Sequence, residues 1–117
     1  LYNTSENHKK IAEAIQEMWK KNLGIDVRLT NQEWQVYLDS RTQLNYEVAR
    51  AGWIGDYLDP MTFLDMWVTG GGNNDTGWGS KKYDELIYAA QAELNTAKRA
   101  KMLHDAETIL MTEMPII

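Results

Sequence analysis

The first part of the chain alternates between two hydrophobic periodicities, and this alternation limits the possible fold more than any other feature. Up to Gly24, apolar residues recur every three or four positions, which is typical of an amphipathic helix. Residues 25–30 then alternate apolar and polar side chains, which is typical of a strand. A second helical pattern begins at Trp34 and places Trp34, Tyr37, Leu38 and Arg41 on one face of the helix. Residues 46–53 are the next strand candidate.

This order of strand, helix, strand, helix and strand implies parallel strands joined by right-handed crossovers. We therefore expect an α/β fold with a small, mainly parallel sheet flanked by helices.

Ser5 is a suitable N-cap for the first helix, and Gly24 is a suitable residue to end it. The apolar face predicted for this helix consists of Ile11, Ile15, Met18, Trp19 and Leu23.

The second part of the chain carries helical patterns only. Asp59-Pro60 combines an N-cap with the proline favoured at the first helical position, and it leads into a short apolar helix. Ser80 and Thr96 are predicted to cap two longer helices. Between them and the short helix, residues 70–79 are rich in glycine and asparagine and predict a flexible surface connection. The predicted apolar faces of the two longer helices consist of Tyr83, Leu86, Ile87 and Ala90, and of Met102, Leu103, Ala106, Ile109 and Leu110.

The pattern divides the chain into a βαβαβ part, residues 1–58, and a helical subdomain, residues 59–117. We expect both parts to belong to a single domain. The chain opens on Leu1 without an initiator Met and stops on an apolar run after Pro115, so we expect a piece of a longer protein. Sheet edges and apolar faces left by such a truncation would favour self-association of the piece.

Composition and charge exclude several classes of function. The 117 residues carry a formal net charge of −5, so the average surface repels phosphates and we expect no nucleic-acid partner. The chain has no cysteine, which removes disulfides and thiolate metal sites. No apolar run approaches the ~20 residues of a membrane helix. Five Trp and six Tyr suit a surface that grips a ligand, although such rings also serve ordinary cores.

The motifs of common cofactor and catalytic sites are absent. The glycine-rich loop lacks the Lys-Ser/Thr pair of a phosphate loop and the closing glutamate of a calcium loop. His8 and His104 do not form a zinc motif, so we expect no metal and no cofactor. Asp56 and Asp59 are one conceivable acid/base pair for a hydrolase, although Asp59 is better explained as a helix cap.

Residues 48–57 combine the features of a ligand site. They lie at the carboxyl end of a predicted strand, and ligand crevices in open sheets lie outside such ends. Two glycines there allow another backbone to approach, and Trp53 and Tyr57 offer flat walls. Arg50 and Asp56 supply one charge of each sign, which suits a zwitterion. The alternative is that Arg50 pairs with Asp56 and that Trp53 fills the core.

Several blocks of residues occur in a fixed order along the chain: Tyr2-Asn3-Thr4-Ser5, His8-Lys9-Lys10, Trp19-Lys20-Lys21-Asn22, Asn31-Gln32-Glu33-Trp34, Leu38-Asp39-Ser40-Arg41, Ala49-Arg50-Ala51-Gly52-Trp53 and Asp56-Tyr57. Together they resemble the oligopeptide-binding proteins of bacterial ABC importers, which belong to a large family of extracellular solute-binding proteins. The resemblance is dense from Leu1 to about Trp67 and looser through the last two predicted helices.

The resemblance implies most of the carboxy-terminal lobe of a two-lobed receptor that closes around an oligopeptide and delivers it to the membrane subunits of an ABC permease. It implies an extracytoplasmic location, either periplasmic or lipid-anchored at the outer face of the cell membrane. It also implies a binding protein and not an enzyme. Two alternatives stay open: a hydrolase domain that uses Asp56 as a catalytic carboxylate, and a structural or interaction domain without a small-molecule site.

The resemblance also implies roles for individual residues. It places the α-ammonium of the peptide on Asp56, and it places hydrogen bonds to the peptide main chain around Gly52 to Ile54. Arg50 and His8 match positions that meet the peptide carboxylate when the peptide is short or slightly longer. A carboxylate at Asp56 fits this role, because enclosing an unmatched ammonium costs several kcal/mol.

The side-chain pockets follow from the same resemblance. Trp53 and Trp34 would form pocket walls, with Leu38 and Arg41 beside Trp34. Main-chain recognition with roomy pockets gives affinity without sequence preference, which suits the import of nutrients. The expected ligand-binding residues are therefore Asp56, Trp53, Arg50, Trp34, Gly52, Ile54, Leu38, Arg41 and His8.

Overall fold

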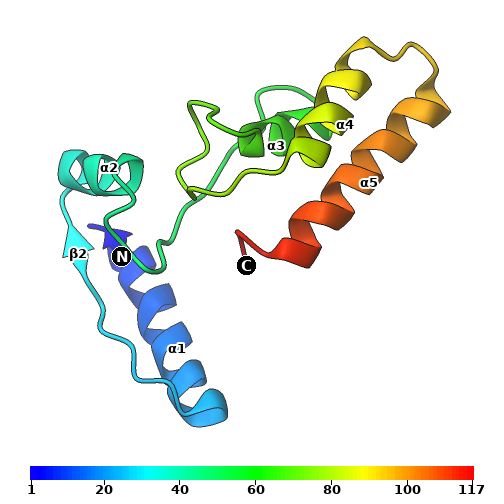
Figure 1. Cartoon of the computed structure of the whole chain (residues 1–117). Coiled ribbons are helices and arrows are strands. Elements are labelled where there is room, and N and C mark those ends of the chain that lie inside the picture. The colour runs from blue at the N-terminus through cyan, green and yellow to red at the C-terminus, as the bar shows by residue number, and fades with distance from the viewer. The chain divides into compact units, whose positions relative to one another are not determined.

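The computed structural model describes residues 1–117, which divide into a first unit, Leu1–Gly52, and a second unit, Trp53–Ile117. Figure 1 shows the short strands in the first unit and a long helical hairpin in the second. None of the helices combines the length and the apolar character needed to cross a membrane.

The first unit is a short parallel sheet in which a helix follows each strand. Its elements are β1 (Tyr2–Asn3), α1 (Glu6–Leu23), β2 (Asn31–Gln32) and α2 (Trp34–Thr42). β1 and β2 pair in parallel, with Tyr2 opposite Asn31 and Asn3 opposite Gln32. Both α1 and α2 contact β1, so the strands connect to helices that pack back onto them, as the sequence predicts.

A third extended segment lies beside β1. The Leu1 nitrogen donates to the Val48 carbonyl at 2.7 Å, and the Leu1 carbonyl accepts from the Arg50 N–H at 2.9 Å. A residue in a parallel pair bonds in this way to the two neighbours of its partner, which here is Ala49. No regular strand is assigned over residues 46–53, and the strand predicted there is reduced to this short parallel pairing.

The strand predicted over residues 25–30 is wrong, because β2 consists of Asn31–Gln32 instead. A strand forms only where a neighbouring strand takes up its backbone N–H and C=O groups. β1 offers such groups over two residues only, and the register places them opposite β2. The Val27 carbonyl instead accepts a hydrogen bond from Gln16 Nε2 of α1 at 2.6 Å.

α1 begins and ends where the sequence predicts. Ser5 is its extended N-cap, although without a side-chain hydrogen bond, and Gly24 ends it in the left-handed region with φ 69°. The predicted apolar face forms but is not covered by the first unit. Ile11 is 44% exposed and Met18 is 52% exposed, and α1 contains no buried residue.

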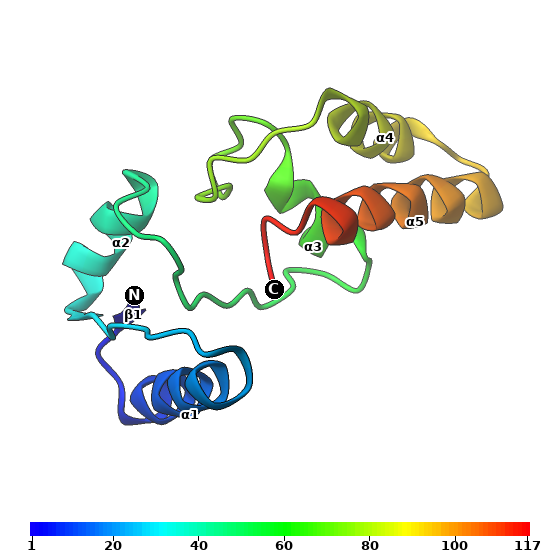
Figure 2. The same ribbon diagram turned by 60° about the horizontal axis from the view of Figure 1, so that its bottom comes forward.

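The second unit is helical and has a single apolar core. It contains α3 (Met61–Leu64), the 3₁₀ turn η1 (Asp65–Trp67), α4 (Lys81–Ala92) and α5 (Thr96–Glu113). α4 and α5 lie side by side in both views, as a hairpin (Figures 1 and 2). The core consists of Met61, Leu64, Tyr83, Ile87, Ala90, Leu103, Ala106 and Leu110, with Leu86, Met102 and Ile109 packed against it, so the predicted helix faces are confirmed.

The caps of the two long helices are set by short side chains. Ser80 Oγ accepts from the Tyr83 N–H at the start of α4, as predicted. The prediction that Thr96 caps the last helix is wrong by one position. Asn95 is the N-cap, its side chain accepts from the Lys98 N–H at 3.0 Å, and Thr96 is the first helical residue. Asn and Thr are both good N-caps, so sequence preference does not separate neighbouring candidates.

The glycine-rich loop is organised around Asn74. Its Nδ2 lies 3.1 Å from the carbonyl oxygens of Trp67 and Val68 and 3.0 Å from that of Trp78. Its Oδ1 accepts from the hydroxyl of Thr76 at 2.6 Å. The loop is irregular, as predicted, and this one side chain joins its two ends.

Parallel pairing with flanking helices in the first unit, followed by the helices of the second, confirms the predicted fold class. The contacts divide the chain between Gly52 and Trp53, so residues 53–58 group with the helical part. That the two parts form a single domain stays a prediction.

Candidate ligand-binding site

Three parallel segments of the first unit end at the same edge of its sheet. β1 leads into α1, β2 leads into α2, and residues 48–50 lead to Gly52. Because the segments run in one direction, the first turns of both helices lie at the edge where Gly52 lies. The predicted site residues that this arrangement brings to one edge are His8, Trp34, Arg50 and Gly52.

Tyr37 is the centre of a side-chain cluster on α2. It is 2% exposed, and its hydroxyl donates to the Arg50 carbonyl at 2.5 Å. The Trp34 ring stacks on Tyr37 with centroids 5.6 Å apart, and the Arg41 guanidinium carbon lies 5.6 Å from the Tyr37 centroid. Trp34 is still 49% exposed, and Leu38, four positions further along the helix, is half-buried. The helix face predicted from spacing therefore forms and presents an exposed indole.

Several polar side-chain groups at this edge lack a hydrogen-bond or ion-pair partner within the first unit. His8 Nδ1 and Gln32 Oε1 are buried without a hydrogen-bond partner, which is rare for side-chain polar atoms in folded proteins. The Arg50 guanidinium has no carboxylate partner among residues 1–52. A Cβ added at Gly52 would lie 3.9 Å from one Nη of Arg50, so the guanidinium lies over the glycine backbone.

The second unit begins with an exposed segment that has no regular structure, residues 53–58. Trp53 is 38% exposed and Ile54 is 90% exposed. The Asp56 N–H donates to Thr62 Oγ1 at 3.0 Å, whereas the Asp56 carboxylate has no hydrogen-bond or ion-pair partner in the second unit. This side chain is therefore held at its backbone and free at its charged end.

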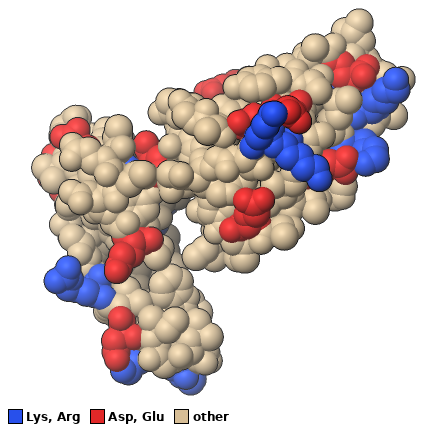
Figure 3. Space-filling view, viewed as in Figure 1, with Lys and Arg blue, Asp and Glu red and all other residues tan.

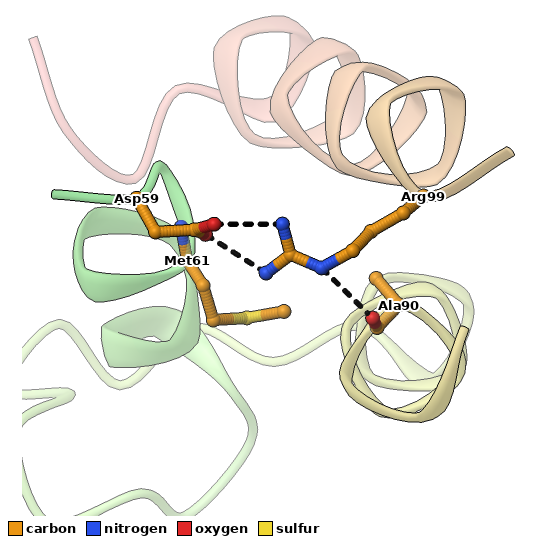
Figure 4. Close-up of polar contacts among 4 residues, drawn as sticks. All are labelled: Asp59, Met61, Ala90 and Arg99. Carbon is orange, nitrogen blue, oxygen red and sulfur yellow. Dashed lines mark hydrogen bonds and ion pairs between the residues drawn. The ribbon is translucent and has the colours of Figure 1, made fainter. Parts of the chain in front are cut away.

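Asp59 differs from Asp56 because both oxygens of its carboxylate have partners within the second unit (Figure 4). Both of its oxygens pair with the guanidinium of Arg99 at 2.8 Å, and Oδ1 also accepts from the Met61 N–H at 2.9 Å. The Arg99 hydrogen bonds, followed by the Met61 N–H, lower the pKa of Asp59. A lowered pKa does not suit the general acid of a hydrolase, and neither oxygen of Asp59 is free to act as the base, which argues against the acid/base pair considered with Asp56.

Negative charge gathers around the turn that carries Asp56. The pKa of Tyr57 is raised, first by desolvation and then by three neighbouring aspartates. These are Asp65, Asp59 and Asp56. Burial and then the charge of Asp56 also raise the pKa of Asp65. Desolvation, the larger cause of both shifts, disfavours charge of either sign, whereas the smaller contribution of the aspartate charges favours a cation.

No group of three or more His, Asp or Glu residues is placed to hold a metal ion. One open hollow of about 290 Å³ lies beside η1 and α4 and another of about 460 Å³ lies beside α1, and neither of these is lined by a predicted site residue. Of the predicted residues, Trp34, Gly52, Trp53, Ile54 and Asp56 are exposed, whereas His8, Leu38, Arg41 and Arg50 are half-buried. Figure 3 shows charges of both signs interspersed on the visible face of each unit, without a large area of one sign.

Two residues with a role near Asp56 are missed by the sequence patterns. Thr62 is 2% exposed and binds the Asp56 backbone, and its only sequence signal is a hydroxyl within a short apolar helix. Arg99 binds Asp59 across forty positions, a separation that no local pattern reports.

Comparison with known proteins gives the same result in sequence and in structure. Residues 1–75 match the family described as bacterial extracellular solute-binding proteins, family 5 Middle. The chain is 49% identical to the oligopeptide-binding protein OppA of Bacillus subtilis and 47% identical to the periplasmic murein peptide-binding protein MppA of Escherichia coli. These matches cover 98% and 99% of this chain but 21% and 22% of the relatives, so the chain spans about a fifth of their length.

Solved structures of such proteins contain the same arrangement. The Escherichia coli murein tripeptide-binding protein MppA matches with a TM-score of 0.92 and 46% identity, over 97% of this chain and 22% of that protein. Haemophilus influenzae OppA, in complex with the peptide RPPGFSPFR, matches with a TM-score of 0.89 and 44% identity, over 93% of this chain and 22% of that protein.

Proposed function

This chain belongs to the bacterial extracellular solute-binding proteins of family 5, and on that premise we propose that it supplies part of a peptide-binding site. The relatives named above bind oligopeptides or murein peptide, and the Haemophilus influenzae structure is a complex with the peptide RPPGFSPFR. The family consists of solute-binding proteins and not of enzymes, which argues against a hydrolase.

One observation carries the proposal. The Asp56 carboxylate has no hydrogen-bond or ion-pair partner in its unit, whereas the carboxylate of Asp59 is bound by Arg99. A carboxylate without a partner, with the charges of other aspartates nearby, is suited to a ligand ammonium. We assign the α-ammonium of the peptide to Asp56. Asp59 is then a structural residue of the same turn.

The peptide main chain would bind to backbone groups around Gly52, Trp53 and Ile54. Residues 53–55 make no backbone–backbone hydrogen bond within the second unit, and Ile54 is 90% exposed. Exposed backbone groups without partners can bind a ligand main chain as an added strand, which accepts any sequence because all peptides share these groups.

The remaining assignments concern the peptide's side chains and its carboxylate. Trp34 and Trp53 are exposed indoles that would wall side-chain pockets, Trp34 together with Leu38 and Arg41. The peptide carboxylate would bind the Arg50 guanidinium, which lacks a partner in its unit, or the half-buried His8.

The partners and location extend the proposal to the whole protein. Membership in this family places the protein outside the cytoplasm. We propose that the full-length protein closes around its peptide and delivers it to the membrane subunits of an ABC permease, and that it is either periplasmic or lipid-anchored. Closure would supply the burial that the exposed residues of each unit lack, so we expect this chain alone to bind peptides weakly or not at all.

Calorimetry on the full-length protein tests the assignment of Asp56. Peptides with a free amino terminus and their N-acetylated forms are titrated into the wild type, Asp56→Asn and Asp59→Asn. Asp56→Asn is expected to weaken binding of the free peptide at least about thirtyfold, because it removes one partner of a buried ion pair, and to leave the acetylated peptide unchanged. Equal losses in the two variants, or equal losses for the two peptides, would contradict the proposal.

Two further experiments distinguish peptide binding from a hydrolase and from a domain without a small-molecule site. Mass spectrometry of peptides incubated with the full-length protein is expected to show no cleavage product, and a product would support the hydrolase. Tryptophan fluorescence is expected to change on peptide addition because Trp34 and Trp53 are exposed. A structural or interaction domain would show no change.

A further inference from the structure

The backbone of Asp56 is attached to α3 by a buried hydroxyl. Asp56 donates its N–H to Thr62 Oγ1 at 3.0 Å, and Thr62 is only 2% exposed although it is polar. Burying a hydroxyl is unfavourable unless it is hydrogen-bonded, so this bond accounts for a polar residue in the apolar Met61–Leu64 helix. Because the donor is the amide of Asp56 itself, the bond fixes the position from which its carboxylate extends.

The residue before Asp56 packs against the same side chain. A Cβ added at Gly55 would lie 3.1 Å from Thr62 Cγ2 and 2.9 Å from Phe63 Cζ. Phe63 is 49% exposed, so its ring has room to move, whereas buried Thr62 does not. Thr62 therefore touches two consecutive residues of the turn, with its methyl group against Gly55 and its hydroxyl on Asp56.

The helix that carries Thr62 is itself fixed. Met61 and Leu64, on either side of it, belong to the apolar core of the second unit. The first free N–H of α3, that of Met61, binds Asp59, whose carboxylate is held by Arg99 of α5. Thr62 is thus a rigid support beneath an exposed and irregular segment.

We propose that Thr62 is the positioning residue for Asp56: its hydroxyl holds the turn so that the free carboxylate stands ready for the ammonium of the ligand. This inference rests on the proposed function, because it concerns the ammonium subsite of that function. Thr62 does not touch the ligand. Its removal affects only ligands whose binding depends on where the Asp56 carboxylate stands, which a general loss of stability would not do.

The test is calorimetry on the full-length protein with a tripeptide and its N-acetylated form. Thr62→Val keeps the shape of the side chain and removes the hydroxyl, and Thr62→Ser keeps the hydroxyl. Thr62→Val is expected to weaken binding of the free tripeptide about tenfold, the factor typical of one lost hydrogen bond, and to leave the acetylated peptide unchanged. Thr62→Ser is expected to bind the free tripeptide nearly as the wild type does.

Two control variants complete the design. Thr108→Val removes a hydroxyl from the exposed face of α5, where it donates to the His104 carbonyl at 2.9 Å, and is expected to change neither affinity. Gly55→Ala pushes on Thr62 from the other side of the contact and is expected to weaken binding of the free tripeptide only. It keeps the proposal testable if Thr62→Val does not fold, as judged by circular dichroism.

Asp56→Asn, measured in the same series, distinguishes a failure of the proposed function from a failure of the positioning role of Thr62. If Asp56→Asn leaves the preference for the free tripeptide intact, the proposed function fails and the role of Thr62 fails with it. If Asp56→Asn abolishes that preference while folded Thr62→Val, or Gly55→Ala in its place, keeps wild-type affinity or weakens both peptides equally, the positioning role alone is overturned.

Discussion

Arg99 binds both carboxylate oxygens of Asp59, and its Nε donates to the Ala90 carbonyl at 3.2 Å. One guanidinium therefore joins the start of α3, the carboxyl end of α4 and the start of α5 (Figure 4). Bidentate pairs of this kind are directional as well as charged. The turn that carries the free Asp56 is thus bounded by a residue that is firmly held.

Loss of this pair should destabilise the second unit. The two side chains are 27% and 29% exposed, so solvent screens part of their attraction. We expect Arg99→Ala to lower the free energy of unfolding by about 1 kcal/mol, and Arg99→Lys to recover only part of this because lysine lacks the planar fork. Urea unfolding of the full-length protein measures both. Lys98→Ala, at an exposed neighbouring position, is the matched control and should be neutral.

The same pair should make stability depend on acid. The pKa of Asp59 is lower in the folded protein than the ordinary value of about 3.9, because Arg99 and the Met61 N–H favour the charged carboxylate. Its contribution is fully present above that ordinary value and is lost as the pH falls through the lowered folded pKa. Unfolding measured from roughly pH 5 to pH 2 should show a shallower acid-induced loss for Arg99→Ala than for the wild type. Parallel curves would refute this.

Asn74 should be the most sensitive position of the glycine-rich loop. Its amide nitrogen faces three carbonyl oxygens, so Asn74→Asp would replace a donor by an anion among acceptors. We expect Asn74→Asp to cost about 2–3 kcal/mol, and more than Asn74→Ala, because it leaves an unsatisfied charge. Thermal unfolding and hydrogen exchange of residues 68–78 check this. Asn73→Asp, next to it and exposed, should change little.

Gly24 should tolerate no side chain without cost. Its φ of 69° lies in the left-handed region, where a Cβ is unfavourable by roughly 1–2 kcal/mol, although nothing lies within 4 Å of the Cβ position. Gly24→Ala is therefore expected to destabilise through backbone strain alone. Gly72→Ala also enters open space but without a positive φ, so an equal loss at both positions would contradict the explanation.

Local features of this fold follow from the sequence because their physics is local. Caps such as Ser80 bind N–H groups a few residues away, and helix faces follow a fixed period. The strand predicted over residues 25–30 is wrong because pairing depends on the length of β1, which lies elsewhere in the chain. Its alternating pattern shows which side chains share a face but not whether a partner is present.

In the candidate site too, the sequence predicts features that depend on nearby residues but not those that depend on contacts between distant ones. Spacing predicts that Trp34, Leu38 and Arg41 share a face of α2, and the contacts of Trp34 and Arg41 with Tyr37 agree with this. Spacing does not reveal Thr62 or Arg99, because each acts through a contact that only the folded chain creates. The assignment of Asp56 itself rests on the family resemblance, because residue chemistry alone leaves pairing with Arg50 open.

A crystal structure of the full-length protein with a bound peptide would locate the amino terminus of the peptide. We expect the amino-terminal nitrogen of the peptide to lie within hydrogen-bond distance of the Asp56 carboxylate, with the Asp56 N–H still donated to Thr62 Oγ1. An Asp56 side chain that points into bulk solvent, or that pairs with a guanidinium of the protein while the peptide is bound, would contradict it.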